Sequence, residues 1–222
     1  MIKEKPFVIT ISRQLGSGGA YIGQRLASRL NILYLDREIL NRAARELGIS
    51  ETELDSRDER VAPRWRSWVE TLAHAYPEYA PPNIDVPMDQ KLYDTVSNIM
   101  RRVSEENSAV IVGRAGSYVL RENPRHLSVF LYANMDFRQQ RVQELYHVTA
   151  PDAIKLISRV DKERKQYHQM FTGQDWLNAC QYHVCLDTSV IGLDKTEDIV
   201  VAAMQARLGI ISQSEKKGSA QP

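Results

Sequence analysis

Residues 9–20 read Ile-Thr-Ile-Ser-Arg-Gln-Leu-Gly-Ser-Gly-Gly-Ala, an apolar run that passes into a glycine-rich turn. An amphipathic helix is predicted to follow, from about Tyr21 to Leu30. Small residues let successive backbone N–H groups point inward, and the helix directs the positive end of its dipole at the same place. The turn is therefore predicted to hold an anion such as a phosphate, with a purely structural turn as the alternative. The predicted anion ligands are Gly16, Ser17, Gly18 and Gly19.

The turn is similar to the P-loop pattern G-x-x-x-x-G-K-[ST], but two of its side chains are missing. With Gly18 as the second glycine, Gly19 stands at the lysine and Ala20 at the Ser/Thr. In that pattern the lysine reaches the β- and γ-phosphates of a nucleotide and the hydroxyl holds Mg²⁺. Arg13, at the position of the first glycine, is the nearest replacement cation. We expect its guanidinium to fold over the loop, with Mg²⁺ held mainly by nucleotide and water.

Length, charge and cysteine content limit the class of protein. The 222 residues, 43% of them hydrophobic, suffice for one domain with an insert, expected over residues 1–211. With 29 basic and 28 acidic residues the net charge is +1, which argues against a general attraction to nucleic acid or a membrane. Cys180 and Cys185 fit neither a metal pair nor a disulfide framework. Without a signal peptide or a membrane-spanning apolar run, we expect a cytoplasmic protein.

Short apolar runs alternate with helical patterns along most of the chain. This rhythm predicts an α/β fold with a doubly wound five-stranded parallel sheet, whose ligands bind beyond the carboxyl ends of the strands. The expected strands cover residues 7–11, 32–35, 109–112, 127–132 and 183–186.

The alternation of strand and helix patterns is interrupted between about residues 55 and 107, which indicates an insert. Trp65, Trp68 and Leu72 share one face of a predicted helix, and docking of the insert on the core is favoured over base stacking for them. A second helix is expected from about Met88 to Glu106. Residues 212–222 are small and polar without periodicity, and are expected to be a disordered tail.

Two charged clusters follow predicted strands. Asp36 and Arg37 are placed to hold a ribose hydroxyl and a phosphate, although Asp36 is equally suited to cap a helix. Arg114 lies between Gly113 and Gly116. Its planar guanidinium group is suited to bidentate hydrogen bonds, and binding of a phosphate or a base edge is favoured over a surface ion pair.

A basic helix follows, within a region of about residues 150–175. One interpretation is a solvated helix with i,i+4 ion pairs. The other is a lid that brings cations to a phosphoryl group during transfer. For Arg138 and Arg141, on an earlier helix, a solvated face is favoured over nucleotide contact.

Six motifs together resemble the cytidylate kinase-like family of P-loop proteins. The resemblance covers nearly all of the chain before the tail. The motifs are S-R-Q-L-G-S-G-G at 12–19, Y-L-D-R-E at 34–38, V-I-V-G-R-A at 110–115, D-K-E-R-K-Q-Y at 161–167, F-T-G at 171–173 and L-D-T-S at 186–189.

The resemblance implies a role for each matching residue. Gly16, Ser17, Gly18 and Gly19 would cradle the ATP phosphates, while Asp36, Arg37 and Arg114 would face the acceptor nucleotide. Ala115 replaces an aspartate that bacterial CMP kinases carry after this arginine. Their lid sequence R-D-D-R-D-R aligns with residues 159–164, which keeps cations at Arg159, Lys162 and Arg164 and a carboxylate at Asp161.

Two classes of function stay open. The first is an enzyme that transfers the γ-phosphoryl group of ATP to CMP or dCMP as a monomer or homodimer, with Arg13, Arg159, Lys162 and Arg164 as the catalytic cations. The second is a nucleotide-binding regulatory protein that has lost turnover, as the missing lysine and hydroxyl suggest. A kinase for another small phosphate acceptor is a third alternative, because the insert would shape acceptor choice.

Overall fold

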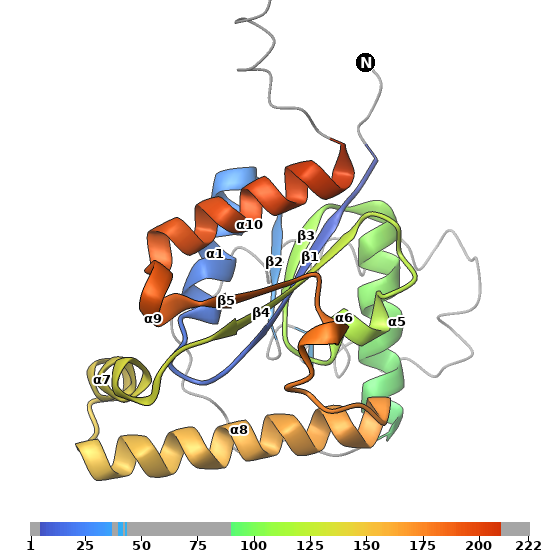
Figure 1. Ribbon diagram of the computed structural model, residues 1–222. Coiled ribbons are helices and arrows are strands. Elements are labelled where there is room, and N and C mark those ends of the chain that lie inside the picture. Colours follow the sequence, from blue (N-terminus) through green and yellow to red (C-terminus); the bar gives the residue numbers. More distant parts are fainter. Residues whose placement is uncertain (1–4, 37–39, 42, 44–89, 210–222) are drawn as a thin grey trace, which may run out of the picture.

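The computed structural model describes residues 5–36, 40, 41, 43 and 90–209. Within them the chain forms one five-stranded parallel sheet with strand order β2-β3-β1-β4-β5 (Figure 1). All five predicted strands are confirmed, as is the doubly wound α/β class. The strands are β1 (Val8–Arg13), β2 (Leu33–Leu35), β3 (Ala109–Val112), β4 (His126–Tyr132) and β5 (Val184–Asp187).

The central strands are apolar because both faces of the sheet are covered. β1 pairs with β3 and β4, so that Val8 lies opposite Ala109 on one side and His126 on the other. All four residues of β3 are buried, as are the first five of β1. A parallel sheet between helix layers requires such continuous apolar runs, which is why the sequence revealed these strands.

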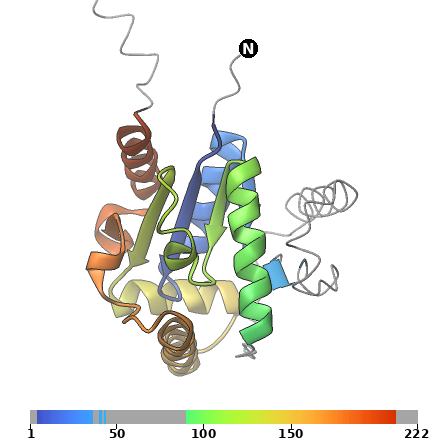
Figure 2. The ribbon, with the colours of Figure 1, turned by 90° about the vertical axis from the view of Figure 1, so that its right-hand side faces the viewer.

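Helices lie on both faces of the sheet and across its carboxyl end. α1 and α10 cover one face and α5 and α6 the other, while α8 runs along the edge where the strands end (Figures 1 and 2). The helices are α1 (Gly19–Leu30), α5 (Gln90–Glu106), α6 (Gly116–Val119), α7 (Met135–Tyr146), α8 (Ala150–Thr172), α9 (Thr188–Ile191) and α10 (Leu193–Leu208), with a 3₁₀ turn η1 (Ala179–Gln181).

Ion pairs join α1 to α10 on one face of the sheet. The buried carboxylate of Glu197 accepts from Nε of Arg25 at 2.6 Å and from Nη1 of Arg29 at 3.0 Å. Two cations therefore compensate one desolvated carboxylate, as a buried charge requires.

The predicted lid region forms one continuous helix. The Thr149 side chain caps α8 by accepting from the Asp152 N–H, and Gly173 ends the helix in the left-handed conformation. The second helix expected in the insert is confirmed as α5. The tryptophan-bearing helix, Arg37 and the tail over 212–222 lie outside the described residues. No helix in the described ranges has the length and apolar character needed to span a membrane.

Candidate functional site

The glycine-rich turn forms a tight loop between β1 and α1. Gly16 and Gly18 have φ angles of +84° and +82°, in the left-handed region that favours glycine. A side-chain carbon on Gly16 would also lie 2.7 Å from the backbone carbonyl oxygen of Arg138, on α7. Glycine is therefore required at this position both by the backbone angle and by the close approach of α7.

The amino-terminal end of α1 faces this loop without a side-chain cap. Gly18 is the N-cap residue and contributes no side-chain hydrogen bond. The first N–H groups of an α-helix have no acceptor within the helix, and together with the helix dipole they favour an anion. The loop therefore retains the backbone features of a phosphate site even though the lysine of the P-loop pattern is absent.

The Ser17 side chain is used to hold the loop. Its hydroxyl donates to the carbonyl oxygen of Gln14 at 2.9 Å or to that of Leu131 on β4 at 3.1 Å. From the other side, the Thr188 hydroxyl lies 2.9 Å from the carbonyl oxygen of Ser17 and donates to it. Ser17 and Thr188 are both fully buried, so these contacts fix the loop against β4 and α9.

α7 and α8 fix the loop through a buried polar network. The Leu15 N–H donates to Oδ1 of Asp161 at 2.9 Å, and Nε of Arg138 donates to the Leu15 carbonyl at 2.8 Å. Nη2 of Arg138 also pairs with Oδ2 of Asp161. Nη1 of Arg164 donates to the carbonyl oxygen of Arg13 at 2.8 Å. The solvated face predicted for Arg138 is wrong, because this side chain is only 5% exposed.

Apolar packing reinforces this network. The Leu15 side chain leaves the loop and is buried with residues of α7 and α8, in a cluster separate from the main core. Its partners are Val142, Ala153, Ile157 and Val160. The loop is thus anchored to the two helices by both its backbone and its largest side chain.

Arg13 connects the loop to the end of β3. Its Cβ and Cγ lie 2.6 Å from where a side-chain carbon would stand on Gly19. A side-chain carbon on Gly113 would collide with Nη1 of Arg13. The arginine therefore extends from the start of α1 toward the carboxyl end of the neighbouring strand, and two glycines provide the space.

Arg114 follows Gly113 in an unusual stretch of backbone. Gly113, Arg114 and Ala115 have φ angles of +87°, +54° and +52° in succession. Non-glycine residues adopt this region at a cost of roughly 1–2 kcal/mol each, and such strain is concentrated at functional sites. The resulting turn buries the Arg114 side chain to 6% exposure.

The Arg114 guanidinium lies beside an aromatic cluster. Its Nη2 donates to Oδ1 of Asn41, and its central carbon lies 5.0 Å from the centre of the Tyr167 ring. Tyr167 packs against Phe171 at 4.7 Å between ring centres, and Phe171 stacks on Tyr93 of α5 at 4.4 Å. Sequence reasoning assigned these aromatic residues no role, although two of them stand within the motifs at 161–167 and 171–173.

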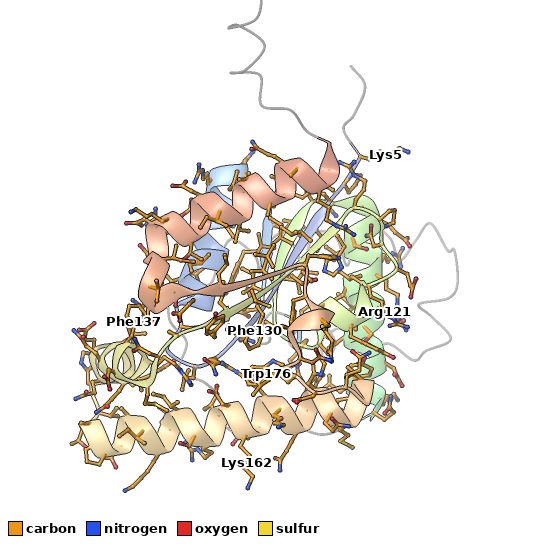
Figure 3. The ribbon with its side chains drawn as sticks, in the orientation of Figure 1. Lys5, Arg121, Phe130, Phe137, Lys162 and Trp176 are labelled. Atoms are coloured by element: carbon orange, nitrogen blue, oxygen red, sulfur yellow. The ribbon has the colours of Figure 1, made fainter. Side chains whose placement is uncertain are left out.

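The remaining predicted site residues lie elsewhere. Arg159 and Lys162 are exposed on the outer side of α8, and Lys162 points away from the sheet (Figure 3). Asp36 directly follows β2 and is partly buried. The structure thus brings Arg13, Arg164 and Asp161 to the loop and Arg114 near it, while Arg159 and Lys162 stay predictions that require a movement of the helix.

The described residues do not bring side chains together in a way that could bind a metal ion. They contain no cluster of three or more histidine, cysteine, aspartate or glutamate side chains suited to a metal. Ala20 has no hydroxyl, and the Ser17 hydroxyl already donates to backbone carbonyls. These residues do not fit a metal held by the loop itself.

The parallel sheet, its strand order and the glycine-rich loop before α1 define an α/β protein of the P-loop kinase type. The chain belongs to the cytidylate kinase-like family, whose pattern matches residues 8–190. It is 21% identical over 206 residues to a cytidylate kinase of Sulfolobus acidocaldarius, covering 92% of this chain and 94% of that protein. It is 25% identical over 211 residues to a cytidylate kinase of Methanopyrus kandleri, covering 90% and 94%.

The fold is shared with a solved structure. An uncharacterized protein from Eubacterium ventriosum superimposes with a TM-score of 0.69 at 23% identity, covering 90% of this chain and 99% of the other. At this identity the likeness concerns the fold alone.

Proposed function

We propose that this protein transfers the γ-phosphoryl group of ATP to a pyrimidine nucleoside monophosphate, CMP or dCMP. The observation that carries the proposal is the arrangement of two arginines around Gly113. Arg13 reaches this glycine from the end of β1, next to the glycine-rich loop that we assign to the phosphate donor, and Arg114 follows the glycine beside the aromatic cluster. Positioned cations between donor and acceptor phosphates are the main requirement of phosphoryl transfer.

On the donor side, the backbone of Gly16, Ser17, Gly18 and Gly19 would hold the ATP phosphates. The open amino-terminal end of α1 supports this assignment. Arg13 would take the place of the missing lysine beside the β- and γ-phosphates, with Arg164 nearby as a second positive charge. Mg²⁺ would arrive with the nucleotide, held by phosphate oxygens and water.

On the acceptor side, Arg114 would bind the monophosphate together with Asp36, which directly follows β2, and the sequence motif adds Arg37 as a further candidate. An oxygen of the acceptor phosphate attacks the γ-phosphorus, the bond to the β,γ-bridging oxygen breaks, and ADP leaves. The attacking oxygen already carries negative charge, so the step needs no general base. The protein's contribution is alignment and electrostatic stabilisation.

A second function, nucleotide binding without turnover, is favoured by one observation. Gly19 and Ala20 stand where the P-loop pattern has its lysine and hydroxyl. A phosphate could then be bound by the loop while the stabilisation of the transferring group is lost.

The test is a coupled assay of ADP formation with ATP and Mg²⁺ against CMP, dCMP, UMP and AMP. We expect turnover with a pyrimidine monophosphate and a loss of about 10²-fold or more in kcat/KM in Arg13→Ala. The matched control is Arg121→Ala, an exposed arginine after α6 that lies over Tyr118 (Figure 3).

The outcomes separate the two functions and test the role of Arg13. Turnover that falls in Arg13→Ala and persists in Arg121→Ala supports the kinase with Arg13 beside the phosphates. Turnover that Arg13→Ala leaves unchanged removes Arg13 from the proposal. Calorimetric binding of ATP with no ADP formation for any acceptor establishes the binding protein instead.

A further inference from the structure

Two buried polar atoms beside the end of β3 lack partners. Within the part of the chain that the structure describes, neither Nε of Arg114 nor the hydroxyl of Tyr167 has a hydrogen-bond partner. The two side chains are 6% and 7% exposed. A buried polar atom left unsatisfied destabilises the folded state, and in native proteins each such atom calls for an explanation.

The two atoms belong to one cluster. The Arg114 guanidinium lies over the Tyr167 ring, and its Nη2 is held by Asn41. Burial raises the pKa of Tyr167, while the positive charge of Arg114 and a polar contact between its guanidinium and the hydroxyl, which falls short of hydrogen-bond geometry, act in the opposite direction. The phenol therefore stays protonated at neutral pH and is available as a hydrogen-bond donor beside a fixed cation.

The Tyr167 ring is held in place by its neighbours. Phe171 packs against it at 4.7 Å between ring centres, and Tyr93 meets it edge-on at 6.2 Å. Both Tyr167 and Phe171 lie on α8, the helix that also presents Asp161 to the Leu15 N–H. A donor that is fixed by packing loses little conformational entropy when it binds a ligand.

We propose that the Tyr167 hydroxyl is a ligand of the acceptor's phosphate group, acting together with Nε of Arg114. A phosphate oxygen accepts hydrogen bonds from both, so one anionic group satisfies both orphaned donors at once. This inference rests on the proposed function, because it gives the acceptor of that reaction a second protein contact. α8 would then hold the donor loop with Asp161 and the acceptor with Tyr167.

The variant Tyr167→Phe tests the hydroxyl alone. It keeps the ring that packs against Phe171 and Arg114, and it removes an unsatisfied polar atom. We expect the melting temperature of the ligand-free protein to stay equal or rise. We expect the KM for the pyrimidine monophosphate to rise about tenfold or more, as for a lost hydrogen bond to a charged group, and the KM for ATP to stay within about twofold.

Tyr182→Phe is the matched control. Its hydroxyl donates to the carbonyl oxygen of Trp176 at 2.8 Å, so this variant loses a satisfied hydrogen bond where Tyr167→Phe loses an unsatisfied hydroxyl. We expect it to lower the melting temperature and to leave both KM values unchanged. Two results would overturn the inference. In the first, the KM of Tyr167→Phe for the pyrimidine monophosphate stays within twofold of that of the natural protein. In the second, the KM for the monophosphate and the KM for ATP rise equally.

A second readout does not depend on catalysis. Inorganic phosphate is added to the natural protein and to Tyr167→Phe in the absence of nucleotides, and the rise in melting temperature that it causes is recorded for each. The donor loop contributes equally to both proteins, so a smaller rise in Tyr167→Phe supports the inference even if no nucleotide is phosphorylated and the proposed function fails. Equal rises in the natural protein and Tyr167→Phe overturn it.

Discussion

At the glycine-rich loop, the Leu15 N–H, the Ser17 hydroxyl and the Arg138 guanidinium all have hydrogen-bond partners. At the end of β3, Nε of Arg114 and the Tyr167 hydroxyl have none in the described ranges. The loop is thus preorganised by contacts with β4, α7 and α8. The region around Arg114 instead contains hydrogen-bond donors without partners. A site whose hydrogen bonds are completed by its ligand requires such donors.

Gly16→Ala is the strongest test of the preorganised loop. Alanine at φ +84° is strained, and its Cβ would lie 2.7 Å from the carbonyl oxygen of Arg138. We expect a loss of about 3 kcal/mol or more in the free energy of unfolding, measured with urea. Gly209→Ala is the control, because its φ is +65° and nothing lies within 4 Å of the new Cβ.

For Gly209→Ala we expect a loss of only about 1 kcal/mol, from backbone strain alone. Equal losses in the two variants would show that the backbone of α7 does not restrict the loop. The loop would then not be held more rigidly by steric contacts than the region around Arg114.

Arg138→Ala tests the polar half of the same contact. It removes one of the two cations paired with the largely buried Asp161 carboxylate, the other being Arg164, and one donor to the Leu15 carbonyl. We expect a loss of about 3 kcal/mol in the free energy of unfolding. In a double-mutant cycle with Asp161→Ala, the double variant should lose clearly less than the sum of the single variants. Additive losses would mean that the two side chains act independently.

Stability should also depend on pH through a region remote from both sites. His126, in β4, is fully buried, and its Nε2 lies 2.7 Å from Oγ1 of Thr10. Burial, with the nearby His183 and Arg207, lowers the pKa of His126 to about 4. The unfolded chain, with an ordinary histidine pKa near 6.5, binds more protons than the fold between these values.

We therefore expect the free energy of unfolding to fall by about 2 kcal/mol between pH 7 and pH 5 on account of His126. Burial also lowers the pKa of His168 and His183, which adds to the effect. Urea titrations at several pH values measure it. His126→Gln should flatten the profile, whereas the exposed His147→Asn should not; parallel profiles for all three proteins would exclude His126 as the cause.

The sheet could be predicted from sequence because its signal is local. Each buried strand is a continuous apolar run, and the Gly16 and Gly18 turn is visible in the residues themselves. The same holds for α8, whose cap at Thr149 and ending at Gly173 are encoded locally.

The contacts that support the site could not be predicted from the sequence. The solvated face predicted for Arg138 is wrong because the partner of this side chain, Asp161, lies 23 residues away in the sequence. Phe171 lies four residues after Tyr167 on α8, a spacing that indicates contact, but the other partners of Tyr167 are Arg114, which follows β3, and Tyr93, on α5. Spacing within one helix contains no information on such partners. The left-handed angles of Arg114 and Ala115 were equally hidden, because neither residue type signals them.

Substitutions on two faces of α8 are expected to have the smallest effects on kcat/KM. Arg164 reaches the carbonyl oxygen of Arg13 at 2.8 Å, whereas Lys162 points away from the sheet (Figure 3). If α8 keeps this orientation during turnover, Arg164→Ala should lower kcat/KM by about tenfold, roughly 1.4 kcal/mol, while Lys162→Ala stays within about twofold. If the helix instead acts as a lid that turns its outer cations inward, Lys162→Ala and Arg159→Ala should cost as much as Arg164→Ala. The comparison decides whether α8 serves as a fixed support for the donor loop, because only a moving helix lets an exposed lysine stabilise the transferring phosphoryl group.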